Sequence, residues 1–126
     1  MSKGNRQLGE WGERQARLHL EARGYSLLAS NFRCRAGEID IVARQGDQLV
    51  FVEVKARRGD AYGGAEESIS PARAERLAEV AEEFLRTQLC GEFDSGTDWR
   101  IDLVCLNMDG RGRLKSISHI ENAVEL

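Results

Sequence analysis

The stretch from Gly37 to Arg57 constrains the fold most, because hydrophobic residues alternate with other residues on both sides of Gly46-Asp47. Alternation with a period of two is typical of a β-strand with one buried face. A glycine at the first central position of a two-residue type II′ turn supplies the positive φ that this turn requires. The pattern therefore predicts two antiparallel strands joined by a tight turn at Gly46-Asp47.

The register of this hairpin brings charged residues together. With Gly46-Asp47 at the centre of the turn, Asp40 lies opposite Glu53, and Glu38 lies opposite Lys55. A slip of one residue would pair Asp40 with a valine and bury its charge, so the pattern itself specifies the register. Val42, Leu49 and Phe51 are expected on the charged face, and Ile39, Ile41, Ala43, Val50, Val52 and Val54 on the opposite face.

Two carboxylates on directly opposed residues repel each other unless something lies between them. Mg²⁺ prefers hard oxygen ligands of this kind and completes its octahedron with water and phosphate oxygens. Lys55, on the same face as Glu53, would add a positive charge beside the ion. A solvated strand face with ordinary ion pairs is the alternative, but the hydrophobic neighbours indicate a covered face. We therefore predict a Mg²⁺ or Mn²⁺ site at Asp40 and Glu53.

Asp40 followed by Glu53-Val54-Lys55 resembles the D…(D/E)XK signature of the PD-(D/E)XK nuclease superfamily. The chain from about Gly9 to Val104 also resembles the small bacterial YraN-like family within that superfamily. Gly37-Glu38-Ile39-Asp40 lacks the proline before the aspartate that gives the superfamily its name. The residues that carry the wider resemblance are Gly12-Glu13, Ala16, Leu20, Gly24-Tyr25, Asn31, Gly37-Glu38-Ile39-Asp40, Phe51-Val52-Glu53-Val54-Lys55 and Arg57.

The resemblance implies a role for each residue of the motif. Asp40 and Glu53 would ligate the metal, and the main-chain carbonyl of Val54 would be a further ligand. Lys55 would position or polarise the attacking water. Glu13, in the first helix, would be an auxiliary acid at the metal site. The alternative for Glu13 is a surface residue that the helix dipole favours near the helix start.

Several arginines are candidates for contacts with nucleic-acid phosphates. Two of them flank Glu13, two follow Lys55 at the start of a glycine-rich segment, and one begins the second helix. The glycine-rich segment, residues 56–70, is expected to be a mobile loop with Tyr62 available for base stacking. Solvated surface positions and a plain connection are the alternatives. The candidate arginines are Arg14, Arg17, Arg57, Arg58 and Arg73.

The rest of the chain predicts two helices and three further strands. Gly24 suits a left-handed cap after the first helix, and Ser70-Pro71 is typical of the start of the second. We expect helices at residues 8–23 and 71–89, strands at residues 25–32, 99–106 and 114–120, and disorder at residues 1–7.

This order, α-β-β-β-α-β-β, predicts an α/β fold with a central mixed β-sheet flanked by helices. The strand after the second helix is expected to lie parallel to a neighbour through a right-handed crossover. The resemblance implies the same architecture, a restriction-endonuclease-like core. Arg100 and Asp102, on one face of that strand, are expected to form a structural ion pair.

Composition limits the other possibilities. A chain of 126 residues with 41% hydrophobic content suits one domain spanning residues 1–126. It has no hydrophobic run of membrane-spanning length and no signal-peptide core, so a cytoplasmic protein without a membrane partner is expected. Cys34, Cys90 and Cys105 lack paired metal spacing and suit reduced thiols. His19 and His119 lie far apart in the sequence and give little support for a histidine metal site.

Charge is distributed unevenly along the chain. The formal net charge is −3, which is unusual for a nucleic-acid-binding protein. Residues 1–58 contain 11 Lys and Arg against 7 Asp and Glu, a balance of +4, and the remainder has a balance of −7. We expect a basic side around the site and an acidic back.

These observations lead to two function hypotheses. The first is a Mg²⁺-dependent or Mn²⁺-dependent endonuclease that hydrolyses phosphodiester bonds in DNA, with structured or branched DNA among its substrates. The second is a non-catalytic module that binds nucleic acid or protein and retains the nuclease fold. A homodimer would suit a small nuclease that acts on two strands, although no sequence feature demonstrates one.

Overall fold

The computed structural model describes residues 3–58, 69–88 and 96–123. These residues form one sheet and two helices, in the predicted order. The strands lie in the order β1-β2-β3-β4-β5, with β3 and β4 parallel and every other neighbouring pair antiparallel. The predicted α/β fold with a mixed sheet is therefore confirmed. The elements are α1 (Lys3–Ala22), β1 (Ser26–Cys34), β2 (Gly37–Gln45), β3 (Gln48–Arg58), α2 (Pro71–Thr87), β4 (Trp99–Met108) and β5 (Leu114–Ile120).

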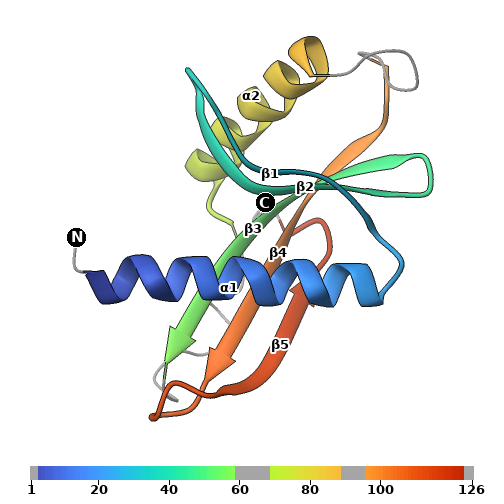
Figure 1. Ribbon diagram of the computed structural model, residues 1–126. Helices are drawn as coiled ribbons and strands as arrows, with labels where there is room; N and C mark the ends of the chain where they lie inside the picture. The colour runs from blue at the N-terminus through green and yellow to red at the C-terminus, as the bar shows by residue number, and fades with distance from the viewer. Residues whose placement is uncertain (1–2, 59–68, 89–95, 124–126) are drawn as a thin grey trace.

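The two helices cover opposite faces of the sheet, because each packs into a separate hydrophobic cluster. Figure 1 shows α1 crossing β3 and β4, whose arrows point in the same direction. The cluster under α1 contains Ala16, Leu20, Ile41, Ala43, Val50, Val52 and Val104. The cluster under α2 contains Val42, Leu49, Phe51, Leu77, Val80, Phe84 and Leu103.

Helix α1 begins earlier than predicted and ends where predicted. It starts at Lys3, so residues 3–7, which were expected to be disordered, are helical. A helix that has formed extends at little cost through residues that include no proline. At the other end Gly24 has a φ of 88°, and the main-chain N–H of Tyr25 donates to the carbonyl of Leu20 at 3.0 Å. This is the predicted left-handed cap.

Gly12 lets α1 approach the sheet closely. A Cβ atom at this position would lie 3.2 Å from Cδ1 of Leu106 and 3.5 Å from Cβ of Ala56. Both neighbours belong to the carboxyl-terminal halves of β3 and β4. The glycine therefore places the adjacent Glu13 beside the end of β3.

The hairpin of β2 and β3 has the predicted turn and register. Gly46 has a φ of 60°, and the pairing runs from Gln45 with Gln48 to Ile41 with Val52. Beyond Ile41, β2 stays paired with β1 only, as far as Gly37 with Cys34. The ribbon of β1 and β2 thus leaves β3 and bends toward α2 (Figure 1).

The prediction for Ile39 was wrong for this reason. Ile39 packs in the cluster under α2 with Val42, and not with Ile41 on the other face. The strict alternation of the two faces does not continue through the bend, where Asn31 of β1 has a φ of 53°. Such a bend in a two-stranded ribbon turns side chains of the same parity toward different neighbours.

Helix α2 begins as predicted. The side-chain oxygen of Ser70 accepts a hydrogen bond from the main-chain N–H of Arg73 at 3.2 Å, and Pro71 occupies the first helical position. The helix runs to Thr87, and the predicted end at residue 89 lies outside the described residues. Neither helix of the described chain is long and hydrophobic enough to span a membrane.

Candidate nuclease site

The predicted acidic pair lies where β2 separates from β3. Asp40 and Glu53 are the next positions after the last pair of the ladder, Ile41 with Val52. The carboxylate Oδ2 of Asp40 instead accepts a hydrogen bond from the main-chain N–H of Val54 at 2.8 Å. The Asp40 side chain therefore replaces a main-chain carbonyl at the edge of β3 and is held next to Glu53-Val54-Lys55.

Negative charges from three elements surround Asp40. The pKa of Asp40 is raised to about 7, chiefly by burial and also by the charges of Glu53, Glu13 and Glu38, although the hydrogen bond from Val54 lowers it. Glu13 of α1 is thus among the charges that act on Asp40. The structure thus brings together the acids that the D…EXK pattern and the resemblance selected.

Arg73 of α2 neutralises the second acid of the pair. Its Nε donates to Oε2 of Glu53 at 2.8 Å, and its second guanidinium nitrogen donates to Oε1 at 3.0 Å. The hydrogen bonds and charge of Glu53 raise the pKa of Arg73, against the effect of burial. A residue predicted to contact nucleic acid therefore contacts a predicted metal ligand. No pattern in the sequence indicates this contact.

Lys55 lies on the same face of β3 as Glu53 and is half-buried. It makes no hydrogen bond or ion pair with any residue that the structure describes. The predicted opposition of Glu38 and Lys55 is not formed, because β2 has separated from β3 at this level. Glu38 instead pairs with Arg33 of β1 at 2.9 Å on the exposed surface.

The other predicted phosphate contacts differ in position. Arg17 lies one turn after Glu13 and is half-buried, whereas Arg14 is exposed. Arg57 is a half-buried residue near the end of β3. The side chain of Arg58, and Tyr62 with the rest of residues 59–68, lie outside the described part of the chain.

The donor atoms of this site fit a divalent cation. Asp40 and Glu53 offer carboxylate oxygens, and the crowding that raises the pKa of Asp40 would be relieved by a positive ion. At Glu53, the positive charge of Arg73 already offsets the charge of the carboxylate. Among the described residues no three acidic, histidine or cysteine side chains are already arranged as a complete ligand set.

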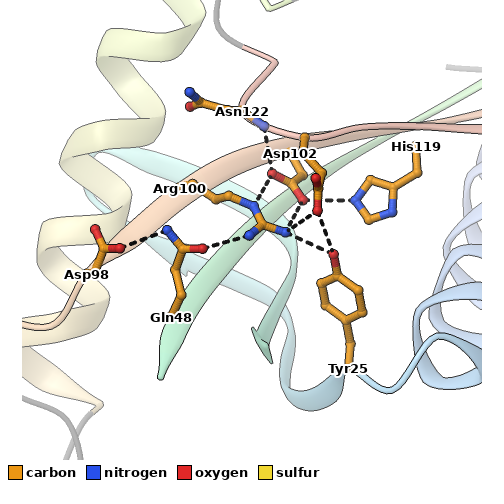
Figure 2. A network of polar contacts seen from close by, with 8 residues as sticks. Tyr25, Gln48, Asp98, Arg100, Asp102, His119 and Asn122 are labelled. Carbon is orange, nitrogen blue, oxygen red and sulfur yellow. Dashed lines mark hydrogen bonds and ion pairs between the residues drawn. The ribbon is translucent and has the colours of Figure 1, made fainter. Parts of the chain in front are cut away.

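A second polar cluster lies at the opposite end of β3. The predicted ion pair of Arg100 and Asp102 is present, with Nε to Oδ1 at 2.9 Å (Figure 2). Asp102 is fully buried and also accepts from the Asn122 main-chain N–H at 2.9 Å. His119 Nε2 lies 2.8 Å from Asp102 Oδ2. An aspartate within a hydrophobic strand is the one sequence feature that indicates this extension.

The same cluster brings together residues that are distant in the sequence. The ring centroids of His19 and His119 are 5.9 Å apart, and Tyr25 packs against His119 at 5.7 Å. A cavity of about 410 Å³ lies beside them, lined by Arg23, Tyr25, Gln45, His119 and Glu121. Together with Gln48 and Asp98, the cluster links β3, β4 and β5 to Tyr25, the residue directly before β1.

Comparison with known proteins decides the family. Residues 12–106, which include Glu13, Asp40, Glu53 and Lys55, match the Uncharacterised protein family UPF0102. The chain belongs to this family. UPF0102 is the YraN family, a nuclease-like group of PD-(D/E)XK proteins, so the resemblance noted in the sequence is confirmed.

The relatives extend over most of the chain. A UPF0102 protein of Roseiflexus castenholzii is 49% identical over 118 residues, covering 94% of this chain and 93% of that protein. One of Pelotomaculum thermopropionicum is 41% identical over 123 residues, covering 98% and 99%. A solved structure, "The structure of Pyrococcus Furiosus SfsA in complex with Ca2+", matches with 16% identity and a TM-score of 0.41, covering 97% of this chain and 65% of that one.

Proposed function

We propose that this protein is a Mg²⁺-dependent or Mn²⁺-dependent endonuclease that hydrolyses phosphodiester bonds in DNA, structured or branched DNA included. The observation that supports this most is the convergence of Asp40, Glu53 and Glu13 beside Lys55 at the point where β2 leaves β3. Membership of a nuclease-like family supports it as well.

Asp40 and Glu53 would hold the cation, with the Val54 carbonyl and the Glu13 carboxylate as further oxygen donors. A bound Mg²⁺ would lower the pKa of a water molecule and offset negative charge on the phosphoryl oxygens. The Val54 N–H keeps the Asp40 carboxylate oriented toward β3 by its 2.8 Å hydrogen bond. The chain's contribution is thus a fixed set of oxygens at one strand edge.

Lys55 would act on the attacking water and the phosphate. Its ammonium group stands on the face of Glu53 and is not committed to a described partner, so it is available to hydrogen-bond a water or a phosphoryl oxygen. Arg17, Arg57 and Arg73 lie on the elements that surround the acids and would bind the DNA backbone. Arg14 and Arg58 are further candidates for phosphate contacts.

One observation favours a second candidate, a non-catalytic module that binds nucleic acid or protein. The acids of the site are already compensated, because Glu53 is paired with Arg73 and the pKa of Asp40 is about 7. A site of this kind is stable without a metal. The net charge of −3 also suits a module that does not rely on broad electrostatic attraction to DNA.

Replacement of Lys55 by alanine separates the two candidates. The variant should bind Mn²⁺ and DNA as the wild type does, while cleavage falls by a factor of roughly 10² to 10⁴, the usual effect of losing a positioned proton-transfer or electrostatic group. Purified proteins are incubated with Mg²⁺ or Mn²⁺ and single-stranded, duplex, flapped and four-way-junction DNA. Lys115→Ala, an exposed lysine of β5, is the matched control and should cleave normally.

Two outcomes would contradict the nuclease proposal. Cleavage that persists unchanged in Lys55→Ala would show different chemistry or a contaminating enzyme. Absence of cleavage by the wild type on every substrate, with DNA binding retained, would support the non-catalytic module.

A further inference from the structure

Arg73 is held in a defined position between α2 and the sheet. Its main-chain N–H donates to the capping oxygen of Ser70 in the first turn of α2. Its guanidinium reaches Glu53 on β3 and also donates to the main-chain carbonyl of Glu38 on β2, at 3.4 Å. Arg73 therefore spans the opening between the separated strands.

The guanidinium uses both carboxylate oxygens of Glu53. Nε bonds to one oxygen and the second nitrogen to the other, in the paired geometry that is specific to arginine. The side chain of Glu53 is only 13% exposed. A cation that used Glu53 as a ligand would need the same lone pairs, so Arg73 and the cation exclude each other at this carboxylate.

The balance of charge at Glu53 also indicates that Arg73 and a cation exclude each other there. Without a cation, the largely buried Glu53 next to Asp40 needs a positive partner, because an unpaired buried carboxylate is costly. With a divalent cation in place, a guanidinium in direct contact would be a second positive charge at the same oxygens. The two forms of the site therefore differ by an exchange of one positive group for another.

We propose that Arg73 is a metal-displaced latch: its guanidinium holds Glu53 in the metal-free protein, leaves Glu53 when the divalent cation binds, and then binds a phosphodiester of the substrate. This inference rests on the proposed function and adds regulation of the same site. Because coupling between sites is reciprocal, metal binding and phosphate binding by Arg73 reinforce each other.

Calorimetry of Mn²⁺ binding tests the first step. Arg73→Gln removes the competitor and should tighten Mn²⁺ binding by about tenfold or more, since hydrogen bonds between charged groups of this kind are worth at least that factor. Arg73→Lys, which keeps the charge but cannot form the paired contact, should fall between wild type and Arg73→Gln. Arg76→Gln, an exposed arginine one turn further along α2, is the matched charge control and should change the affinity by less than about twofold.

Binding of a fluorescent DNA duplex tests the second step. In the presence of Ca²⁺, used as a hard oxygen-seeking cation, Arg73→Gln should weaken DNA binding several-fold relative to wild type. In EDTA, where the latch occupies Arg73 in the wild type, the two proteins should bind DNA equally. A thermal unfolding curve for each variant confirms that the compared proteins are folded.

The possible results distinguish failure of the latch from failure of the metal site. If wild type and Arg73→Gln bind Mn²⁺ equally, or if the variant binds it more weakly, the latch is wrong while the metal site stands. If neither the wild type nor Arg73→Gln binds Mn²⁺, the latch and the metal-dependent function fail together. An equal loss of DNA affinity with and without Ca²⁺ would show that Arg73 contacts DNA independently of the metal.

Discussion

Asp40 shows how a single side chain sets the properties of the site. Its carboxylate lies at a strand edge, accepts one main-chain hydrogen bond and is surrounded by three acids on α1, β2 and β3. Burial is the largest reason that its pKa is raised to about 7. A carboxyl group with this pKa takes up a proton near neutrality and gives it up to a cation. Metal affinity at this site should therefore rise with pH through about 7.

Replacing Asp40 by asparagine should stabilise the metal-free protein while abolishing Mg²⁺ binding. The asparagine oxygen still accepts from Val54, but no charge is buried. Because the pKa is about 7 in the fold and 3.8 in the reference state, protonated Asp40 contributes stability that is complete below pH 3.8 and is lost as pH rises through 7. The free energy of unfolding of the variant should thus exceed that of the wild type by up to about 4 kcal/mol at pH 8 and by little at pH 4.

Urea denaturation in EDTA across this pH range measures the gain, and calorimetry measures Mg²⁺ binding. A stability difference that does not vary with pH would show that the Asp40 carboxyl is not perturbed. Mg²⁺ binding that is unchanged in the variant would remove Asp40 from the metal site.

At the level of elements, the site depends on two features: the separation of β2 from β3 and the close packing of α1 against the sheet. The departure of β2 from β3 after Ile41 opens the edge at which Asp40 bonds to Val54. The close approach of α1 through Gly12 brings Glu13 to the same edge. Neither feature contributes chemistry itself, but together they allow acids of three separate elements to act on the charge of Asp40.

Gly12→Leu should therefore disturb both packing and the site. The larger side chain would overlap Leu106 and Ala56, and overpacking of this kind costs about 1–3 kcal/mol. Glu13 would move away from Asp40, so Mn²⁺ affinity should fall as well. Gly9→Ala is the control, because a Cβ atom there meets nothing within 4 Å, and it should stabilise the helix by about 0.5–1 kcal/mol.

Urea denaturation and Mn²⁺ calorimetry are measured on both glycine variants. A Gly12→Leu protein as stable as the wild type would show that α1 can move away from the sheet freely.

At the scale of the whole molecule, a charged cluster lies at each end of β3, and the two clusters have different roles. In the first cluster, Glu53 is paired with Arg73. In the second, Asp102 is hydrogen-bonded to Arg100, His119 and Asn122. Burial alone would raise the pKa of Asp102, but the hydrogen bonds from His119, Arg100 and Asn122 outweigh it and hold the pKa below its usual value. This second cluster joins the third, fourth and fifth strands of the sheet to Tyr25, which directly precedes the first strand.

Asp102→Asn should lower the free energy of unfolding by about 3–5 kcal/mol at pH 7, because Arg100 is left without its buried partner. The depressed pKa means that the stability from Asp102 is present above pH 3.8 and is lost as pH falls below this value. The Asp102→Asn variant should lack this acid-sensitive contribution to its stability. The double variant, Asp102→Asn with Arg100→Met, should lose less stability than the sum of the losses in the two single variants.

Chemical denaturation between pH 2 and pH 7 measures these effects. Strictly additive losses from the two single variants would show that Arg100 and Asp102 act independently.

The sequence by itself determined the local structure and the chemistry of the motif. Period-two alternation and Gly46 specified the hairpin and its register, and Gly24 and Ser70-Pro71 marked the ends of the helices. These features depend on interactions between residues close in the chain, so the residue types carry enough information. The resemblance added Glu13, which no local pattern distinguishes from a surface glutamate.

Only the tertiary structure decided which distant groups meet. The bend of β1 and β2 moved Ile39 to the face of α2 and ended the ladder before Glu38 reached Lys55. The packing of α2 placed Arg73 on Glu53, and the order of the strands brought His119 to Asp102 and His19. These contacts depend on the twist of the sheet and on how helices pack against it. That packing is a property of the whole core, and no short stretch of sequence contains it.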